Sequence, residues 1–347
     1  MRLFRVLLLG FGLALGAGFP AVPSTSGQQN NPPQQPAIRA TTEIVKIDVN
    51  VQDKSGNFLD GLAQTDFRVT DDGMERPILF FAPVEAPAQV LVMVETSPAV
   101  YLIHEQHLSA VYALLDGLGP DDQVALVDYD QAPRAILAFT REKAELASAL
   151  PQIQYTIGMG ELHFYDSISM VMDWLAPLQG KKALVLLSTG LDSSPPERWQ
   201  ALTEKLRADD AVIYPVALGG SLRETGDKKK KPRKSEHGAG TSADAGSSDP
   251  PNPLSFAKAN EALRSMARIT GGRVYFPESA KDFVSIYREI AAGLRHQYVL
   301  GIAPEHDGRF HSLLVEVVGG PGGRSSSKAK GAEYRVFARE GYRAPSP

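Results

Sequence analysis

The pattern of apolar and polar residues changes twice along this chain. Glu43–Val51 alternates between the two kinds of residue, and a second alternating segment, Asp66–Thr70, leads into the turn residues Asp71-Asp72-Gly73. Pro77–Ala82 continues the alternation. A period of two is typical of half-buried β-strands separated by polar turns. The pattern therefore predicts a small β-module at residues 41–85.

From Val90 onward, short apolar segments alternate with longer amphipathic ones, which predicts strand–helix–strand units and a parallel sheet. The expected strands are Val90–Val94, Gln123–Asp128, Arg134–Phe139, Ala183–Leu187, Ala211–Leu218 and Arg273–Phe276. The expected helices are Leu102–Gly117, Lys143–Leu150, Tyr165–Leu175, Glu197–Ala208, Leu254–Ile269 and Ala280–Leu294. We expect the third strand to be an antiparallel edge, because the turn before it is too short for a crossover helix.

Three more alternating segments follow this region, at Gln297–Ile302, His311–Val318 and Glu333–Arg339. They lie too far along the chain to extend the parallel sheet simply, so we expect them to pair with the N-terminal strands. The predicted fold class is α/β. It combines a doubly wound, mostly parallel six-stranded sheet with a small β-sandwich-like module built from the N- and C-terminal strands.

Two segments do not fit either pattern. Arg2 and Arg5 precede an apolar run, Val6–Ala17, and then small residues, which is typical of a secretory signal peptide. The run is shorter than the roughly 20 residues of a spanning helix, so we expect cleavage rather than the alternative, a retained anchor. Residues 221–253 contain the basic run Lys228–Lys231, which predicts a disordered insertion. We expect it to be a solvated loop, with contact to an anionic group as the alternative.

These patterns divide the chain into five parts. They are a signal peptide at 1–23, a Pro/Gln-rich disordered spacer at 24–40, the N-terminal β-module at 41–85, an α/β domain at 88–296 and C-terminal strands with a tail at 297–347.

Composition narrows the functional classes. The chain has 347 residues, a formal net charge of -4 and no cysteine. So small a charge does not indicate a nucleic-acid partner. Without cysteine the chain has neither disulfides nor the lipid anchor of a bacterial lipoprotein. We expect an exported protein, periplasmic or extracellular, with no stable membrane span once the signal is removed.

The most informative site is the polar turn after the first apolar strand, Glu95-Thr96-Ser97-Pro98-Ala99. Ligands of parallel α/β sheets bind just beyond the carboxyl ends of the strands. A protein partner or cell-surface ligand is therefore expected at the loops of this edge. The candidate partner-binding residues are Glu95, Thr96, Ser97, Glu161, His163, Thr189 and Asp192.

Several segments carry a family resemblance. They are VQDKSGNFLDGLAQTDFRVTDDG from Val51, ETSPA from Glu95, FYDSI from Phe164, ALVLLSTGLD from Ala183, and LRHQYVLGIAP with the final REGYRAP. In this order and spacing they resemble an exported bacterial family named for its von Willebrand factor A-related domain, described mainly from acidobacteria. The resemblance implies a von Willebrand factor A fold that binds partners at the strand-end loops.

In metal-binding relatives these loops hold a divalent cation, and this sequence departs from that pattern. Ser97 keeps one serine of the first loop, but Glu95 replaces an aspartate and Ala99 replaces the second serine. Leu162 and Thr189 occupy the positions of a threonine and an aspartate in the other two loops. Mg²⁺ requires near-octahedral oxygen ligands. We therefore expect a degenerate site with no bound cofactor.

Two alternatives remain. Glu95, Ser97, His163 and Asp192 are weak candidates for a nonstandard divalent-cation site, because carboxylates with an imidazole suit a transition metal. The chain would then be a metal-dependent adhesion or sensor module. The other alternative is an envelope hydrolase with an unrecognised site. No catalytic residue stands out, so the sequence favours a noncatalytic interaction or adhesion module.

Overall fold

Strand β5 (Ala88–Glu95) lies at the centre of the α/β sheet in this computed structural model, which describes residues 43–84, 86–101, 104–156, 161–218, 255–279, 281–320 and 334–347. The sheet has the order β7-β6-β5-β8-β9. Its other strands are β6 (Gln123–Tyr129), β7 (Pro133–Thr140), β8 (Lys181–Ser188) and β9 (Val212–Ala217). All pairs are parallel except β6–β7, so the expected antiparallel edge strand is confirmed.

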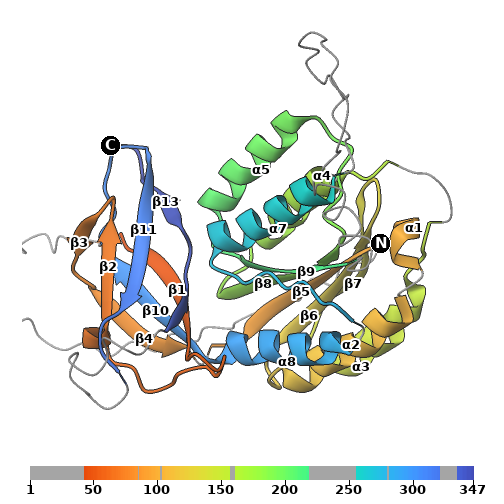
Figure 1. Ribbon diagram of the computed structural model, residues 1–347, viewed down its shortest axis with the longest axis horizontal. Coiled ribbons are helices and arrows are strands. Elements are labelled where there is room, and N and C mark those ends of the chain that lie inside the picture. The colour runs from red at the N-terminus through yellow and green to blue at the C-terminus, as the bar shows by residue number, and fades with distance from the viewer. Residues whose placement is uncertain are drawn as a thin grey trace, which may run out of the picture. The chain divides into compact units, whose positions relative to one another are not determined.

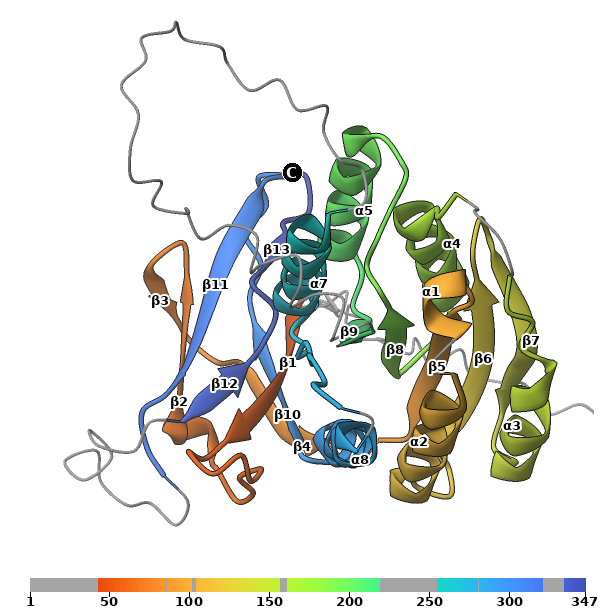
Figure 2. The same cartoon turned by 45° about the vertical axis from the view of Figure 1, so that its right-hand side comes forward.

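Helices cover both faces of this sheet (Figures 1 and 2). On one face, α2 (His104–Gly117), α3 (Lys143–Ala149) and α8 (Asp282–Arg295) share an apolar core with Val90, Val92 and Val94. The other face is covered by α4 (Phe164–Leu175), α5 (Pro196–Ala208) and α7 (Phe256–Thr270). Leu91 and Met93 point into this second core, because successive residues of a strand face opposite sides. Shorter helical segments are α1 (Pro98–Tyr101), Gln64–Asp66 and Leu150–Gln152.

Among the described residues the sheet has five strands, and the predicted sixth strand, Arg273–Phe276, is not one of them. Tyr275 makes a single bridge to Val216 on β9. The outer edge of β9 has few free donors, because Pro215 has no N–H and the Ile213 N–H donates to Thr270 Oγ1 at 3.0 Å. The six-stranded prediction was therefore wrong by one strand.

Strands from both ends of the chain form two antiparallel four-stranded sheets (Figure 2). The first has the order β12-β1-β10-β4, and the second has the order β13-β11-β2-β3. The strands of the first are β12 (Arg335–Phe337), β1 (Val45–Gln52), β10 (Gln297–Ile302) and β4 (Phe80–Val84). Those of the second are β13 (Gly341–Arg343), β11 (Phe310–Val317), β2 (Phe67–Asp71) and β3 (Met74–Arg76).

The two antiparallel sheets share one apolar cluster. Ile47 and Leu300 from the first sheet and Val69, Leu313 and Val315 from the second are among its buried members. Residues Thr42–Pro347 form one compact unit, and polar contacts join the antiparallel sheets to the helices of the α/β sheet within it.

Several expectations lie outside the described residues. They are the signal peptide at 1–23, the spacer at 24–40 and the whole of the basic insertion at 221–253. Among the helices that the structure describes, none has the length and apolar character needed to cross a bilayer.

A buried lysine at the start of β8 gives the first testable prediction. Burial lowers the pKa of Lys181 to about 8, and its ammonium group donates to the carbonyl of Leu294. The unfolded chain therefore binds this proton over a range in which the folded chain has released it. Burying the charged ammonium group destabilises the folded chain. This destabilisation is complete below pH 8, and it disappears as the pH rises towards 10.5. We expect the free energy of unfolding to rise across this window by on the order of 2 kcal/mol because of this one group.

The comparison of wild type with Lys181→Met isolates this effect. Urea unfolding across that pH range should show the free energy of unfolding of the wild type rising with pH. The difference in free energy of unfolding between the wild type and Lys181→Met should become smaller as the pH rises. Lys182→Met is the control, because the Lys182 ammonium lies beside the carboxylates of Asp209 and Asp210. An equal pH dependence in wild type and Lys181→Met would refute the assignment.

Candidate functional site at the carboxyl edge of the sheet

Glu95 ends the central strand, and its side chain is fully buried, with 0% exposed surface. Its Oε1 accepts from Ser97 Oγ at 2.5 Å and from Thr189 Oγ1 at 2.9 Å. Its Oε2 accepts from the Thr189 N–H at 2.7 Å, Ser188 Oγ at 2.9 Å and the Tyr129 hydroxyl at 3.1 Å. These donors come from the ends of β5, β6 and β8, which are neighbours in the sheet. The carboxylate is thus enclosed by protein donors.

The donors around Glu95 are themselves fixed in place. The hydroxyls of Tyr129 and Ser188 lie 2.6 Å apart, and Ser188 Oγ also accepts from the Gly190 N–H at 2.8 Å. Burial and the nearby charge of Glu95 raise the pKa of Tyr129 well above its usual value. Tyr129 therefore keeps its proton and remains a donor at physiological pH.

This arrangement explains the departures from the metal-binding pattern in physical terms. The side chain of Glu95 is one methylene longer than an aspartate, and it extends to donors on the loop after β8. Thr189 offers that carboxylate a hydroxyl and an N–H, where an aspartate would offer a second negative charge. Ala99 and Leu162 have no side-chain oxygen for a cation. The residues present do not fit an octahedral Mg²⁺ site.

The structure does not bring His163 and Asp192 to Glu95 as common ligands. His163 Nε2 lies 3.1 Å from Glu161 Oε2 at the exposed start of α4. Asp192 accepts from the Tyr165 N–H at 3.1 Å and the Ser194 N–H at 2.7 Å, and burial raises its pKa. Asp192 therefore fastens the loop after β8 to the first turn of α4.

The predicted partner-binding residues fall into two groups. Glu95, Thr96, Ser97, Thr189 and Asp192 are buried. Thr96 Oγ1, for example, donates to the carbonyl of Tyr129 at 3.0 Å. Glu161 and His163 are the members that reach the surface. The buried group shapes the edge of the sheet, and Glu161 and His163 present their side chains at its surface.

A groove of about 470 Å³ opens beside these loops, between α5, α7 and the loop after β8. Tyr165 and Trp199 form its aromatic part, with ring centroids 5.2 Å apart. Lys258 and Glu261 on α7 supply charged groups to its lining. The groove and the exposed pair Glu161 and His163 are at the same edge of the sheet.

The sequence interpretation missed Tyr129, Ser188 and the groove. Tyr129 and Ser188 are the last residues of β6 and β8, so their position after apolar strands was an available signal. The groove depends on the distance between α5 and α7, which are far apart in the sequence and in contact in the structure. The distance between these two helices cannot be predicted from a sequence pattern.

Comparisons place the chain among distant structural neighbours. No protein-family model and no curated protein matches it. The structure of BatB from Bacteroides thetaiotaomicron is 15% identical, with a TM-score of 0.40 over 60% of this chain and 98% of that one. A von Willebrand factor type A protein from Catenulispora acidiphila is 10% identical, with a TM-score of 0.42 over 87% and 75% of the two chains. A mutant of the PilB minor pilin from Streptococcus sanguinis is 9% identical, with a TM-score of 0.44 over 62% and 63%. Similarities this distant carry no argument about function.

Proposed function

We propose that this chain is an exported, noncatalytic module that binds a protein partner at the carboxyl edge of its α/β sheet, without a metal ion at that edge. The proposal rests on the closed hydrogen-bond network around Glu95. In a metal-dependent interaction site the ligand oxygens must be open to the cation. Here they accept from the protein itself.

The same network supports a noncatalytic role. The hydroxyls of Ser97 and Ser188 each lie beside the Glu95 carboxylate, a pairing that could activate a serine as a nucleophile. Both are buried and donate to Glu95, so no substrate atom has access to them. Export is supported by the charged and apolar pattern of residues 1–23.

The groove beside α5 and α7 is the proposed contact surface. Aromatic side chains in a pocket with a polar rim are typical binding hot spots. Trp199 and Tyr165 supply the aromatic surface, and Lys258 and Glu261 line the groove with charges of both signs. Such a surface fits a protein segment with an apolar anchor and polar flanks.

This proposal predicts chelator-resistant binding. The immobilised chain is used to capture a partner from cell-envelope extract, the partner is purified, and its Kd is measured by calorimetry with chelator and with Mg²⁺. We expect the two Kd values to agree within about twofold, and Trp199→Ala to weaken binding by about tenfold or more. The reason is that the indole supplies contact area, whereas no cation bridges the partners.

Trp174→Ala is the matched control, because Trp174 is a partly exposed tryptophan on α4 that does not line the groove. It should leave the Kd unchanged. Binding that disappears with chelator and returns with a divalent cation would instead support the metal-dependent alternative. Equal losses in the two tryptophan variants would refute the assignment of the surface.

A further inference from the structure

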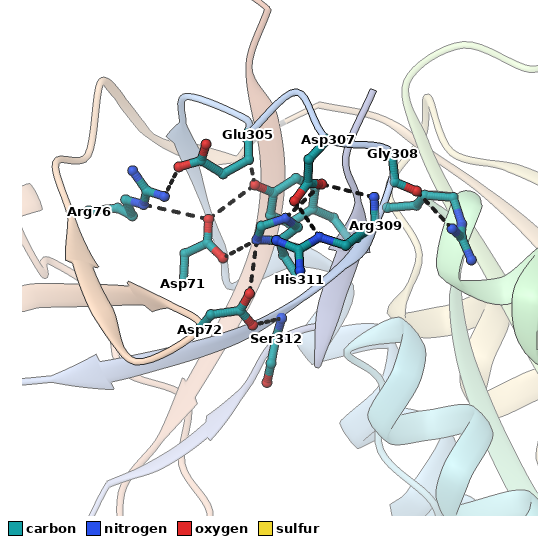
Figure 3. A network of polar contacts seen from close by, with 11 residues as sticks. Asp71, Asp72, Arg76, Glu305, Asp307, Gly308, Arg309, His311 and Ser312 are labelled. Atoms are coloured by element: carbon teal, nitrogen blue, oxygen red, sulfur yellow. Dashed lines mark hydrogen bonds and ion pairs between the residues drawn. The ribbon is translucent and has the colours of Figure 1, made fainter. Parts of the chain in front are cut away.

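We propose a divalent transition-metal site, with Zn²⁺ as the best-fitting ion, formed by Asp71, Asp72 and His311 at one end of the β2–β11 strand pair. It lies in the antiparallel sheets, apart from the edge that carries the proposed function. Within the described part of the chain, these residues form the one group of three or more His, Asp or Glu side chains close enough to share an ion. Figure 3 shows their side chains pointing towards one another.

The turn between β2 and β3 brings the two aspartates together. Asp72 and Gly73 both have positive φ, 47° and 81°, as the two-residue type I′ hairpin turn requires. Asp71 pairs with Leu313 of β11, so the turn lies beside His311. Asp72 is also tied to β11, because its N–H donates to the Ser312 carbonyl at 2.8 Å.

One atom of each ligand points to a common centre. His311 Nδ1 lies 2.9 Å from Asp71 Oδ1 and 3.1 Å from Asp72 Oδ2. A tetrahedral ion with bonds of about 2.0 Å separates its ligand atoms by about 3.3 Å. The imidazole nitrogen therefore needs to move away from each carboxylate oxygen by only a few tenths of an ångström to admit the ion, and the three ligand atoms lie within 4.8 Å of one another.

The remaining atom of each ligand is anchored by a neighbour. Asp71 Oδ2 accepts from the Tyr342 hydroxyl at 3.1 Å, and Asp72 Oδ1 accepts from the Ser312 N–H at 2.9 Å. His311 Nε2 lies 3.1 Å from Asp307 Oδ1. An imidazole that donates one N–H to a carboxylate presents its other nitrogen as a metal ligand, which is the usual outer-shell arrangement of metal-binding histidines.

The local charge also favours a cation. Three carboxylates lie beside His311, from Asp71, Asp72 and Asp307, and a fourth, from Glu305, belongs to the same polar network (Figure 3). Two guanidinium groups face them, with Arg76 beside Glu305 and Asp71, and Arg309 paired with Asp307. With a neutral imidazole the cluster keeps two negative charges in excess, which one divalent ion neutralises.

Exposure and ligand chemistry define the kind of ion. Asp71 and His311 are buried, whereas the Asp72 side chain is 47% exposed, so water can reach a fourth position. One imidazole with two carboxylates suits Zn²⁺ and its first-row neighbours better than Ca²⁺ or Mg²⁺, which prefer oxygen ligands alone.

The test uses the full-length purified chain, stripped of metal with a chelator. Its thermal unfolding is followed at neutral pH with no metal, with Zn²⁺ and with Ca²⁺, and bound zinc is counted after equilibrium dialysis. We expect one tightly bound zinc per chain and a rise in Tm of about 5 °C at a hundredfold excess over Kd. Ca²⁺ should leave Tm unchanged.

Asp72→Asn tests the site itself. The amide keeps an oxygen for the Ser312 N–H and the residue is half-exposed, so the metal-free Tm should stay close to that of the wild type. Zinc affinity should fall by about tenfold or more, and Asp307→Asn should weaken it by a similar factor. Glu316→Gln, an exposed carboxylate on the same strand β11, is the control that keeps wild-type affinity.

Two results would overturn the assignment. The first is equal zinc binding by wild type and Asp72→Asn, which would place the ion elsewhere. The second is the absence of any zinc-dependent rise in Tm, which would make the cluster an ion-pair network centred on a protonated His311. Neither result depends on partner binding, so the failure of this site and that of the proposed function are distinguishable.

Discussion

Replacing Glu95 with alanine should lower the free energy of unfolding by about 4 kcal/mol. The substitution removes the buried carboxylate that accepts from the hydroxyls of Ser97, Tyr129, Ser188 and Thr189 and from the N–H of Thr189. It also opens a cavity at the end of the central strand. Chemical denaturation of the purified chain measures the effect directly.

The glutamine variant separates charge from volume. Glu95→Gln preserves the shape of the side chain, and the hydroxyls near Oε1 can reorient to accept from the new amide. The fixed N–H of Thr189 requires that Oε2 remain an oxygen. We expect a smaller loss, about 1–2 kcal/mol. Glu161→Ala, an exposed carboxylate at the same edge, should change stability by less than about 0.5 kcal/mol. A Glu95→Ala protein as stable as the wild type would contradict the enclosed network.

Asn50→Asp should destabilise the chain by about 3 kcal/mol, the second-largest effect that we expect. The Asn50 amide on β1 donates to the carbonyls of Gly293 and His296, both at 2.7 Å, at the end of α8. A carboxylate of the same shape removes both hydrogen bonds and sets a negative charge against the negative end of the helix dipole. The change is measured by urea unfolding.

Two further variants identify the cause. Asn50→Ala removes the hydrogen bonds without adding charge, so its loss of stability should be smaller than that of Asn50→Asp. Asn57→Ala alters an exposed asparagine in the following turn and should have an effect below about 0.5 kcal/mol. If Asn50→Asp and Asn50→Ala lose the same stability, the helix dipole plays no part in the effect.

The parallel sheet could be predicted because its strands are apolar on both faces. Val90 to Val94 contain no polar residue, and the residues point alternately into the two helix-covered cores. The segment around Tyr275 was predicted as a strand from a similar apolar pattern, but it does not form a strand of the sheet. Strand pairing also depends on the backbone donors that the adjacent strand, β9, offers. Pro215 on β9 has no backbone N–H and so offers no donor at its position, and the sequence of Arg273–Phe276 alone does not reveal that.

The candidate site was predictable in position but not in chemistry. A polar turn after an apolar strand identified Glu95 as part of the strand-end edge. Whether Glu95 faces a cation or hydroxyl groups depends on Tyr129 and Ser188, which enter from neighbouring strands. The Asp71–Asp72–His311 cluster was even harder to predict from the sequence. Its aspartates have the pattern of an ordinary turn, and its histidine lies in an alternating strand more than 200 residues away.

The pairing of the two ends of the chain determines when folding can finish. Val45 in β1 pairs with Ile302 in β10, and β2 pairs with β11. Neither β1 nor β2 has its main neighbour until more than 200 further residues have been synthesised. Contacts this distant in sequence slow folding, because a long loop must close before they form. The α/β part contains its own sheet order and core, so it can fold first and hold the two ends near each other. A nascent chain that ends before β10 therefore exposes unpaired β1 and β4 edges, which are templates for aggregation.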